Sequence, residues 1–498
     1  MRVLIFHGYL LAGTGSNVYN ARLAGALARL GHEVHMVCQD RDPAAAGIDA
    51  RVRVHNPDIG RLLPVYVADE YEGFDAKPFL ECSDEEIAAY VDANVAAVRA
   101  VADEVAPDVA LANHLVMGPA ILARALEDRV PYAVKVHGSA LEYVVKRDPD
   151  RFMPFAREGL ARARCVLVGS LHTGSSLWEA MDDPSLPGRT RLGPPGVEVE
   201  EFVPRERGEA TRRLRALAEE LSGSTASVGV GAFGRDEAAV GAALASLEPG
   251  AERFVLFVGK LIVSKGVDLL AAAWPLVLAR VPDVRLVIVG FGAYREGFER
   301  LLDALTAGDL DGVRALAEEG RAAEGGPRGR LEMLLAFLDG LEGAEREAYV
   351  AAAARLREQV TIVGRLDHHE LAELLPLCEA QVVPSTFPEA FGMVAAEAAS
   401  CGVLPVSAAH SGLAEVSRTL AASAPPEAAA LLSFDLGPGT VRELAARLVA
   451  WLEAPEALRH AMEAALVATS HERYSWEGVA RGVVAAAEGR VDDLAPPA

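Results

Sequence analysis

The sequence predicts two α/β domains, each built on a parallel β-sheet. Two series of short apolar segments point to this fold, one before and one after a Pro- and Gly-rich stretch at 193–204. In both series, glycine-containing loops or helical periods follow the apolar segments, which is the pattern of strand–helix–strand units. The length agrees with two domains, because 498 residues exceed what one compact core usually holds.

The first series starts at the N-terminus. Val3–Phe6 is apolar throughout, as expected of a parallel strand that is buried on both faces. A helical period runs from Val18 to Leu30, and Gly31 suits the end of that helix. Four further strands are expected in this half of the chain, at Val34–Cys38, Val109–Ala112, Tyr132–Val136 and Val166–Gly169.

The second series starts at Phe254–Val258, which a helix at Val267–Leu278 follows. Asp367 and Glu370 have the spacing of a capping box at the start of a later helix. The other expected elements are strands at Arg285–Val289, Val360–Val363, Ala380–Val383 and Val403–Val406, and helices at His368–Leu375 and from about Gly392. Two charged, Ala-rich stretches, at about 205–252 and 303–358, predict helical insertions.

Composition and charge exclude several classes of protein. A net charge of −23 argues against a nucleic-acid partner, because phosphates would be repelled. The sequence contains no run of about 18 apolar residues, and the apolar run at the N-terminus is too short for a signal peptide. Acidic side chains outnumber basic ones in residues 1–200, so membrane contact is expected to be peripheral at most. Five scattered cysteines without CxxC spacing predict free thiols, and we expect a cytoplasmic protein.

The strongest candidate site lies in PSTFPEAFGMVAAEAASCG at 384–402. Glu389 is expected in a loop after a strand, and Glu397 on the helix that follows. The amides around Phe391, Gly392 and Met393 would lie at the N-terminus of that helix, where an anion or a hydroxyl-rich ligand is favoured. Two carboxylates suit the vicinal hydroxyls of a ribose or a hexose. Two solvated glutamates are the alternative, but the surrounding Pro, Phe and Gly pattern favours a binding site.

A second candidate lies in FVGKLIVSKG at 257–266. Lys260 and Lys265 are expected between a strand and a helix, and open α/β sheets bind ligands beyond the carboxyl ends of their strands. Two ammonium groups there could neutralise a diphosphate. Solvated lysines are the alternative, although lysine is scarce in this arginine-rich chain.

The histidines and the first glycine loop give weaker signals. His137 follows an apolar strand, and such a residue is more often structural when it is considered alone. His7, His114 and His410 could line the cleft, but a structural role is favoured for each. Gly13 and Gly15 match part of the dinucleotide fingerprint, but the third glycine is missing. The adjacent pair His368 and His369 does not predict a metal site, because the two side chains would diverge on a helix.

Together with LVIVGFG and VGRLDHHEL, these segments resemble retaining glycosyltransferases of family 4, which have the GT-B fold. The Glu-x7-Glu pattern is the specific part. In the first half, GTGSNVYNARLAGALARLGHEV, VKVHGSALEY and PPGVEVEEFVP are similar to the family's glycine loop, His-Gly segment and linker, and ERYSWEGVA at 472–480 to its C-terminal helix. The resemblance covers most of the chain, but it does not extend to residues at about 205–252 and 303–358.

The resemblance implies the domain arrangement and the roles of the site residues. It implies two Rossmann-like domains that face each other across a cleft, the first at 1–204 with a returning helix at about 472–490, the second at 205–470. Lys260 and Lys265 would hold the diphosphate, Glu397 the ribose, and Glu389 with the amides of Ala390, Phe391, Gly392 and Met393 the transferred sugar. Arg365 would border the base, Gly15 and Ser16 would approach the diphosphate, and His137 would lie at the reactive face of the sugar.

The implied reaction transfers a hexose from a nucleotide diphosphate sugar to a hydroxyl acceptor, with retention. A UDP-sugar is expected before a GDP- or ADP-sugar, and the acceptor is a small molecule, a glycan or a lipid-linked compound. Neither a metal ion nor another cofactor is expected. The family more often has arginine where Lys260 stands, so the bidentate fork is lost. A sugar-nucleotide epimerase or isomerase of the same fold, and a non-catalytic sugar-nucleotide-binding scaffold, remain alternatives.

Overall fold

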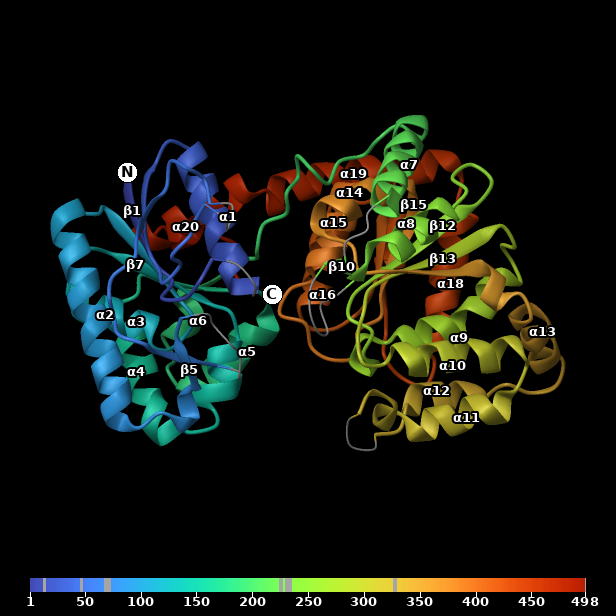
Figure 1. The fold of residues 1–498 in the computed structure, drawn as a ribbon, viewed down its shortest axis with the longest axis horizontal. Helices are drawn as coiled ribbons and strands as arrows, with labels where there is room; N and C mark the ends of the chain where they lie inside the picture. The colour runs from blue at the N-terminus through green and yellow to red at the C-terminus, as the bar shows by residue number, and fades with distance from the viewer. Residues whose placement is uncertain are drawn as a thin grey trace. The chain divides into compact units, whose positions relative to one another are not determined.

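The computed structural model describes residues 1–11, 15–44, 48–66, 73–223, 227–228, 235–325 and 329–497. The chain forms two compact units, residues 1–196 with 473–498, and residues 197–472 (Figure 1). The division follows Gly196 because the next segment packs on the second unit, where Ser400 Oγ donates a hydrogen bond of 2.6 Å to the carbonyl oxygen of Phe202. Gly13 lies outside the described residues.

The first unit contains a seven-stranded parallel sheet in the order β3-β2-β1-β6-β7-β8-β9. Its strands are β1 (Arg2–Phe6), β2 (Glu33–Val37), β3 (Arg53–His55), β6 (Val109–Asn113), β7 (Tyr132–Val136), β8 (Cys165–Val168) and β9 (Thr190–Leu192). Strand order reverses between β1 and β6, which is the topological switch point where such sheets bind ligands. A separate two-stranded parallel sheet pairs β4 (Leu62–Val65) with β5 (Asp75–Pro78).

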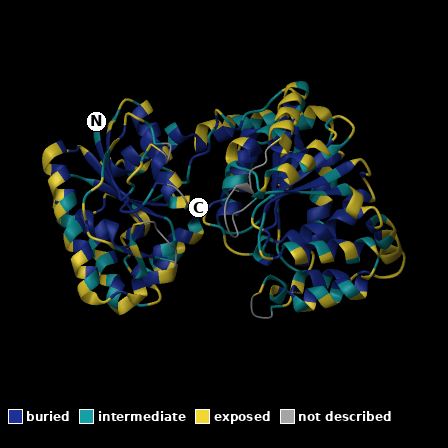
Figure 2. Ribbon diagram, in the orientation of Figure 1, coloured by how far each residue is buried: buried dark blue, intermediate teal, exposed yellow. Residues whose placement is uncertain are grey.

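Helices cover both faces of this sheet, because alternate strand residues point into two different cores. Val3 and Ile5 of β1 join the core under α1 and α20, whereas Leu4 and Phe6 join the core under α2, α3 and α4. The helices are α1 (Gly15–Arg29), α2 (Asp84–Val105), α3 (Gly118–Leu126), α4 (Pro149–Ala161), α5 (Leu171–Met181), α6 (Leu186–Arg189) and α20 (Trp476–Glu488). Figure 2 shows both sheets as buried and the outer helix faces as exposed.

The C-terminal helix α20 belongs to the first unit. It lies beside α1, and Arg29 at the end of α1 forms an ion pair of 2.7 Å with Glu477 (Figure 1). A β-carbon at Gly196 would lie 2.4 Å from the ring of Trp476, so the end of the first unit packs directly on this helix.

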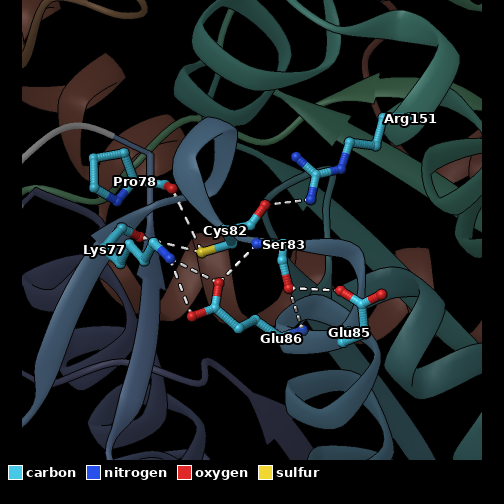
Figure 3. A network of polar contacts seen from close by, with 7 residues as sticks. All are labelled: Lys77, Pro78, Cys82, Ser83, Glu85, Glu86 and Arg151. Carbon is cyan, nitrogen blue, oxygen red and sulfur yellow. Dashed lines mark hydrogen bonds and ion pairs between the residues drawn. The ribbon is translucent and has the colours of Figure 1, made fainter.

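The start of α2 shows how side chains fix local structure in the first unit (Figure 3). Glu86 N–H donates to Ser83 Oγ at 3.2 Å, and Ser83 N–H donates to the Glu86 carboxylate at 2.7 Å, which makes a capping box. Lys77 at β5 pairs with the same carboxylate at 2.8 Å, and Arg151 on α4 donates to the Cys82 carbonyl. These contacts tie β5, α2 and α4 together, so we treat this network as structural.

The second unit contains a six-stranded parallel sheet in the order β14-β13-β12-β15-β16-β17. The strands are β12 (Arg253–Val258), β13 (Val284–Val289), β14 (Val360–Gly364), β15 (Cys378–Val383), β16 (Leu404–Ala408) and β17 (Ser433–Phe434). Strand order reverses between β12 and β15, so the loops after these two strands are neighbours.

The helices of the second unit include both predicted insertions. Helices α7 (Arg207–Gly223) and α8 (Glu237–Ala245) flank the short antiparallel pair β10 (Ser227–Val228) and β11 (Arg235–Asp236). The second insertion is covered by α10 (Arg295–Thr306), α11 (Leu310–Glu319), α12 (Glu332–Asp339) and α13 (Gly343–Ala353). The remaining helices are α9 (Val267–Leu278), α14 (His368–Leu374), α15 (Met393–Ser400), α16 (Ser411–Ala421), α17 (Pro426–Ala429), α18 (Thr440–Leu452) and α19 (Glu456–Tyr474).

Side-chain contacts attach both insertions to the second unit. Arg235 forms an ion pair of 2.5 Å with the buried carboxylate of Glu370 on α14. Tyr349 on α13 donates a hydrogen bond of 2.9 Å to the carbonyl oxygen of Ala272 on α9. The prediction of two parallel-sheet α/β domains is confirmed, and both insertions are helical as expected.

Candidate active site

The loop after β12 and the loop after β15 are bound to each other by hydrogen bonds. The N–H of Thr386 donates to the carbonyl oxygen of Ser264 at 2.9 Å, and Ser385 Oγ lies 3.2 Å from the same oxygen. Gly266 has φ +69°, and a β-carbon there would lie 2.0 Å from the carbonyl oxygen of Pro384. Only glycine allows this approach, so Gly266 is required by the contact between the loops as well as by the turn.

This contact brings Lys265 and Glu389 together. Their side chains form an ion pair between Nζ and Oε1, and Ser385 Oγ donates a hydrogen bond of 2.8 Å to the same carboxylate oxygen. The two charged side chains are 31% and 25% exposed, so a ligand can reach them. Glu389 Oε2 has no hydrogen-bond partner within the described residues, and it can accept a hydrogen bond from a ligand.

The backbone of Glu389 is fixed from a third loop, which follows β16. The N–H of Glu389 donates to Ser411 Oγ at 2.8 Å, and the N–H of Gly412 donates to the carbonyl oxygen of Glu389 at 2.9 Å. Gly412 also packs on Phe391, where an added β-carbon would lie 2.4 Å from the backbone. Three loops at one edge of the sheet therefore determine where Glu389 lies.

The amides expected to bind the sugar lie at the start of α15. Gly392 precedes this helix with φ +139°, and no side chain caps the helix N-terminus. Phe391 is buried, Gly392 and Met393 are half-buried, and Ala390 is exposed. An uncapped helix N-terminus presents N–H groups and a partial positive charge, which suit an oxyanion or sugar hydroxyls.

Glu397 lies on α15, one to two turns beyond the loop, and only 2% of it is exposed. Its Oε1 is 3.3 Å from Nδ1 of the exposed His368, whereas Oε2 is buried without a partner among the described residues. Burial raises the pKa of this carboxyl group. A buried acceptor without a donor is costly, so it marks a place where a ligand hydroxyl would complete the hydrogen bonding. The contact between His368 and Glu397 could not be predicted from the sequence, because it joins two helices.

Lys260 and Arg365 differ in how firmly they are held. Lys260 is exposed in the loop after β12 and makes no ion pair in the described part of the chain. Arg365 follows β14 and pairs with Asp367 at 3.0 Å. The structure therefore brings Lys265 into direct contact with Glu389, while Lys260 and Arg365 lie in the loops after β12 and β14.

In the first unit, the polar groups gather beyond β1, β6 and β7. The neutral ring of His137 donates from Nε2 to Asn113 Oδ1 at 2.9 Å, which leaves Nδ1 as an acceptor. Asn113 in turn donates to Asn20 Oδ1 at 2.7 Å, and Asn20 donates to the carbonyl oxygen of Ser16 at 2.8 Å. Gly15 is exposed and begins α1. The chain of amides thus links Ser16 at the start of α1 to His137 at the end of β7.

Burial keeps the histidines of this cluster neutral. It lowers the pKa of His137 well below 6.5, with further contributions from His114 and Lys135. It also lowers the pKa of His7 to about 4 and that of Lys135 to about 7. His7 accepts from Asn20 at 3.1 Å and forms a hydrogen bond with Asn17 at 2.9 Å.

His114 differs from its neighbours. It has φ +67°, it is buried, and neither ring nitrogen has a hydrogen-bond partner among the residues that the structure describes. Its ring lies 4.9 Å from that of His137 and 4.6 Å from that of Tyr66, measured between centroids. The roles of Asn20 and Asn113, which link Ser16 to His137, could not be predicted from the sequence. Single asparagines in a helix and at a strand end form no recognisable pattern.

Three absences hold within the described ranges. No group of three or more His, Cys, Asp or Glu side chains is arranged to bind a metal ion. All five cysteines are buried and unpaired. No helix there combines the length and the apolar character that crossing a membrane requires.

Family models match most of the chain. A model described as "Glycosyl transferase 4-like domain" matches residues 14–178, and two described as "Glycosyl transferases group 1" match residues 252–319 and 329–465. Two curated relatives are each named D-inositol 3-phosphate glycosyltransferase. The one from Segniliparus rotundus is 29% identical over 56% of this chain and 49% of its own length, so that match spans about half of the relative. The one from Frankia alni is 25% identical over 80% of this chain and 78% of its own.

Solved structures of low sequence identity share the fold. A glycosyltransferase from Rickettsia africae has a TM-score of 0.59 at 13% identity, with 98% of each chain covered. Sucrose-phosphate synthase from Thermosynechococcus elongatus has a TM-score of 0.53 at 20% identity, with 99% of each covered. HepE from Anabaena, solved in complex with UDP-glucose, has a TM-score of 0.54 at 16% identity and covers 97% of this chain and 98% of its own. The chain belongs to the group 1 glycosyltransferases of family 4 and has the GT-B fold.

Proposed function

We propose that this glycosyltransferase transfers a hexose from a UDP-sugar to a hydroxyl group of its acceptor, with retention at the anomeric carbon. One observation carries the proposal: Lys265 and Glu389 meet beside the uncapped N-terminus of α15, at the switch point of the second sheet. A cation, a carboxylate and free amides at one sheet edge match the diphosphate and the hydroxyls of a nucleotide sugar.

In the proposed complex, each part of the donor has a partner. Lys265, with Lys260, binds the diphosphate. Glu397 accepts from the ribose, which agrees with its unpartnered Oε2. Glu389 and the amides of Ala390–Met393 bind hydroxyls of the hexose, and Arg365 borders the base.

The proposed reaction proceeds on one face of the sugar. The bond from the anomeric carbon to the diphosphate oxygen breaks, and the acceptor oxygen forms its bond from the same side. The departing phosphate oxygen takes the acceptor proton. Lys265, Lys260 and the amides of α15 stabilise the negative charge that develops on the diphosphate. His137 stays neutral and accepts a hydrogen bond at Nδ1 from a sugar hydroxyl, while Glu389 positions the sugar and is not a nucleophile.

UDP is the first nucleotide to test, because HepE of the same fold was solved with UDP-glucose. An inositol phosphate is the first acceptor to test, because the curated relatives carry that name.

A thermal-shift titration tests the donor. UDP, GDP, ADP and dTDP are compared with their glucose or mannose conjugates, using the wild type, Lys265→Ala and the exposed control His460→Gln. We expect saturable stabilisation by UDP and UDP-glucose that is lost only in Lys265→Ala. A product assay then separates the alternatives, because a transferase gives a glycoside, an epimerase gives an isomer, and a scaffold gives no product. Stabilisation by none of the nucleotides would contradict the proposed donor site.

A further inference from the structure

The loop between β16 and α16 places two polar side chains behind Glu389. His410 and Ser411 occupy this loop, and β16 pairs with β15, whose following loop carries Glu389. Both side chains are half-buried. The sequence favoured a structural role for His410, but its contacts lead to the carboxylate that is proposed to bind the sugar.

Four hydrogen bonds form a closed chain that starts and ends at Glu389. The N–H of Glu389 donates to Ser411 Oγ at 2.8 Å, and Ser411 Oγ lies 3.1 Å from His410 Nδ1. His410 Nε2 lies 2.7 Å from the carbonyl oxygen of Ser385. Ser385 Oγ then donates to Glu389 Oε1 at 2.8 Å. The backbone and the carboxylate of Glu389 are therefore held by the same set of residues.

The chemistry of the groups fixes the direction of this chain. The carbonyl oxygen of Ser385 can only accept, so His410 Nε2 must carry a proton. In neutral His410, Nδ1 is then an acceptor, and the hydroxyl of Ser411 donates to it. The lone pairs of Ser411 Oγ remain free to accept from the N–H of Glu389. Every donor in the chain therefore faces an acceptor.

The backbone of Ser411 supports a specific role for its hydroxyl. Ser411 has φ +49°, a conformation that side chains other than that of glycine rarely adopt. Glycine would occupy this position with less strain, but it would leave the N–H of Glu389 without its acceptor. A serine in this conformation therefore strains the backbone, but its hydroxyl accepts the hydrogen bond from the N–H of Glu389.

The chain has a consequence for the ligand-bound site. In the structure, Glu389 Oε1 is held by Lys265 and by Ser385. If Lys265 turns toward a diphosphate, Ser385 is the remaining side chain that holds this oxygen, and the carbonyl group of Ser385 is held by His410. The orientation of Glu389 in the complex then depends on the hydrogen bonds through Ser385, His410 and Ser411.

We propose that His410 and Ser411 are positioning residues, which hold Glu389 in the orientation that binds the hexose of the donor. The proposal rests on the proposed function, because it assumes that Glu389 binds the sugar. It predicts that these residues affect recognition of the sugar and leave recognition of the nucleotide unchanged.

Calorimetric titration with UDP and with UDP-glucose tests the proposal. The variants are Ser411→Gly, which suits the positive φ and removes the hydroxymethyl side chain, and His410→Phe, which removes both ring nitrogens. His460→Gln is the matched control, because His460 is exposed on α19. We expect the affinity for UDP to stay within about twofold of the wild type, and the affinity for UDP-glucose relative to UDP to fall at least about fivefold. Ser411→Asn tolerates positive φ and keeps a donor and an acceptor, so it is expected to recover part of the loss.

Each outcome separates this proposal from the proposed function. An unchanged ratio of the two affinities in Ser411→Gly overturns the positioning role and leaves the donor site intact. An equal loss of both affinities also overturns it, because the residues would then only support the loops. A wild type that binds UDP-glucose no better than an unrelated nucleotide overturns the proposed function, and the positioning role with it.

Discussion

Lys265 and Glu389 lie 124 residues apart in the sequence, and their side chains form an ion pair. The pair joins the residue expected to bind the diphosphate to the residue expected to bind the sugar. Each partner neutralises the other, so a bound diphosphate would compete with Glu389 for the ammonium group of Lys265. Nucleotide binding is thereby expected to change the contact between the Glu389 carboxylate and Lys265.

Substitutions in this pair are expected to separate nucleotide binding from sugar binding. Lys265→Met removes a charge-assisted contact, and we expect UDP affinity to fall by about 1.5–3 kcal/mol, roughly 10- to 150-fold. Glu389→Gln removes the competitor for Lys265, so UDP affinity is expected to be equal or tighter. The same variant is expected to lose at least roughly 100-fold in turnover, because the sugar is no longer positioned. Calorimetry and a donor-consumption assay measure the two effects, and normal turnover in Glu389→Gln would falsify its role.

Glu397 is expected to lower the stability of the folded protein at neutral pH and to contribute to nucleotide binding. Burial raises the pKa of its carboxyl group above the ordinary value of 4.5, so the folded protein holds this proton more tightly than the unfolded chain. Its stabilising effect is complete below pH 4.5 and is lost as the pH rises through the raised pKa. Above that pKa, the folded protein contains a buried charge whose Oε2 has no partner among the described residues.

Glu397→Gln therefore gives opposite effects on stability and on binding. At pH 7.5 we expect a gain of about 1 kcal/mol, or roughly 2–4 °C in Tm, and a gain that shrinks toward pH 4.5. UDP affinity is expected to fall about tenfold at pH 7.5, because an amide replaces the carboxylate that is proposed to accept from the ribose. Thermal unfolding from pH 4.5 to 8, with and without UDP, measures both. A variant that is less stable at pH 7.5 and binds UDP normally would count against this assignment.

Gly266 is expected to control whether the two site loops can meet. A β-carbon there would lie 2.0 Å from the carbonyl oxygen of Pro384, in a backbone with φ +69°. Gly266→Ala is expected to cost about 1–3 kcal/mol in stability and to abolish UDP binding, because the loop that carries Lys265 would move away from the loop that leads to the amides of α15. Gly437→Ala is the control, because a β-carbon there meets no atom within 4 Å, and its effect should stay within about 0.5 kcal/mol. Urea unfolding and UDP titration of both variants test this prediction. Equal stability and equal UDP affinity in the two variants would show that the close contact of Gly266 with Pro384 is not required.

The sequence predicted the strands of both sheets well, because parallel strands buried on both faces appear as short apolar runs. β7 at Tyr132–Val136 matches its prediction in full, and β12 differs from its prediction by one residue. Strands of two or three residues, such as β9 and β17, were missed, because so short a segment carries no period. They pair only because the neighbouring strand is already in place.

The candidate site also contains residues that could be predicted from the sequence and contacts that could not. Lys265 and Glu389 were found because each lies in a segment with a recognisable local pattern. The contacts of Glu389 with Ser411, and of His137 with Asn113, could not be predicted, because they join residues that only the sheet order brings together. Gly266 was interpreted as a turn glycine, whereas its contact with Pro384 depends on a loop more than a hundred residues later.

The hydrogen bond between His137 and Asn113 is expected to determine the protonation state of the histidine. Burial holds the pKa of His137 well below 6.5, so Nδ1 stays an acceptor throughout the neutral range. The wild-type rate is therefore expected to show no ionisation of His137 between about pH 6 and 8. In Asn113→Asp, a carboxylate faces the Nε2 proton and favours the imidazolium form, which raises the pKa of His137. The protonated ring carries a hydrogen on Nδ1 and cannot accept there.

Asn113→Asp is thus expected to lose turnover on the acidic side and to regain it as the pH rises. We expect a fall of at least roughly tenfold at pH 6.5, with recovery toward pH 9, and an affinity for UDP that stays close to that of the wild type. Asn113→Leu serves as the comparison, because it removes the acceptor of the Nε2 proton without adding charge; its loss should not depend on pH. Donor turnover measured from pH 6 to 9 for the three proteins tests this. Parallel pH profiles for wild type and Asn113→Asp would show that the protonation state of His137 does not matter for turnover.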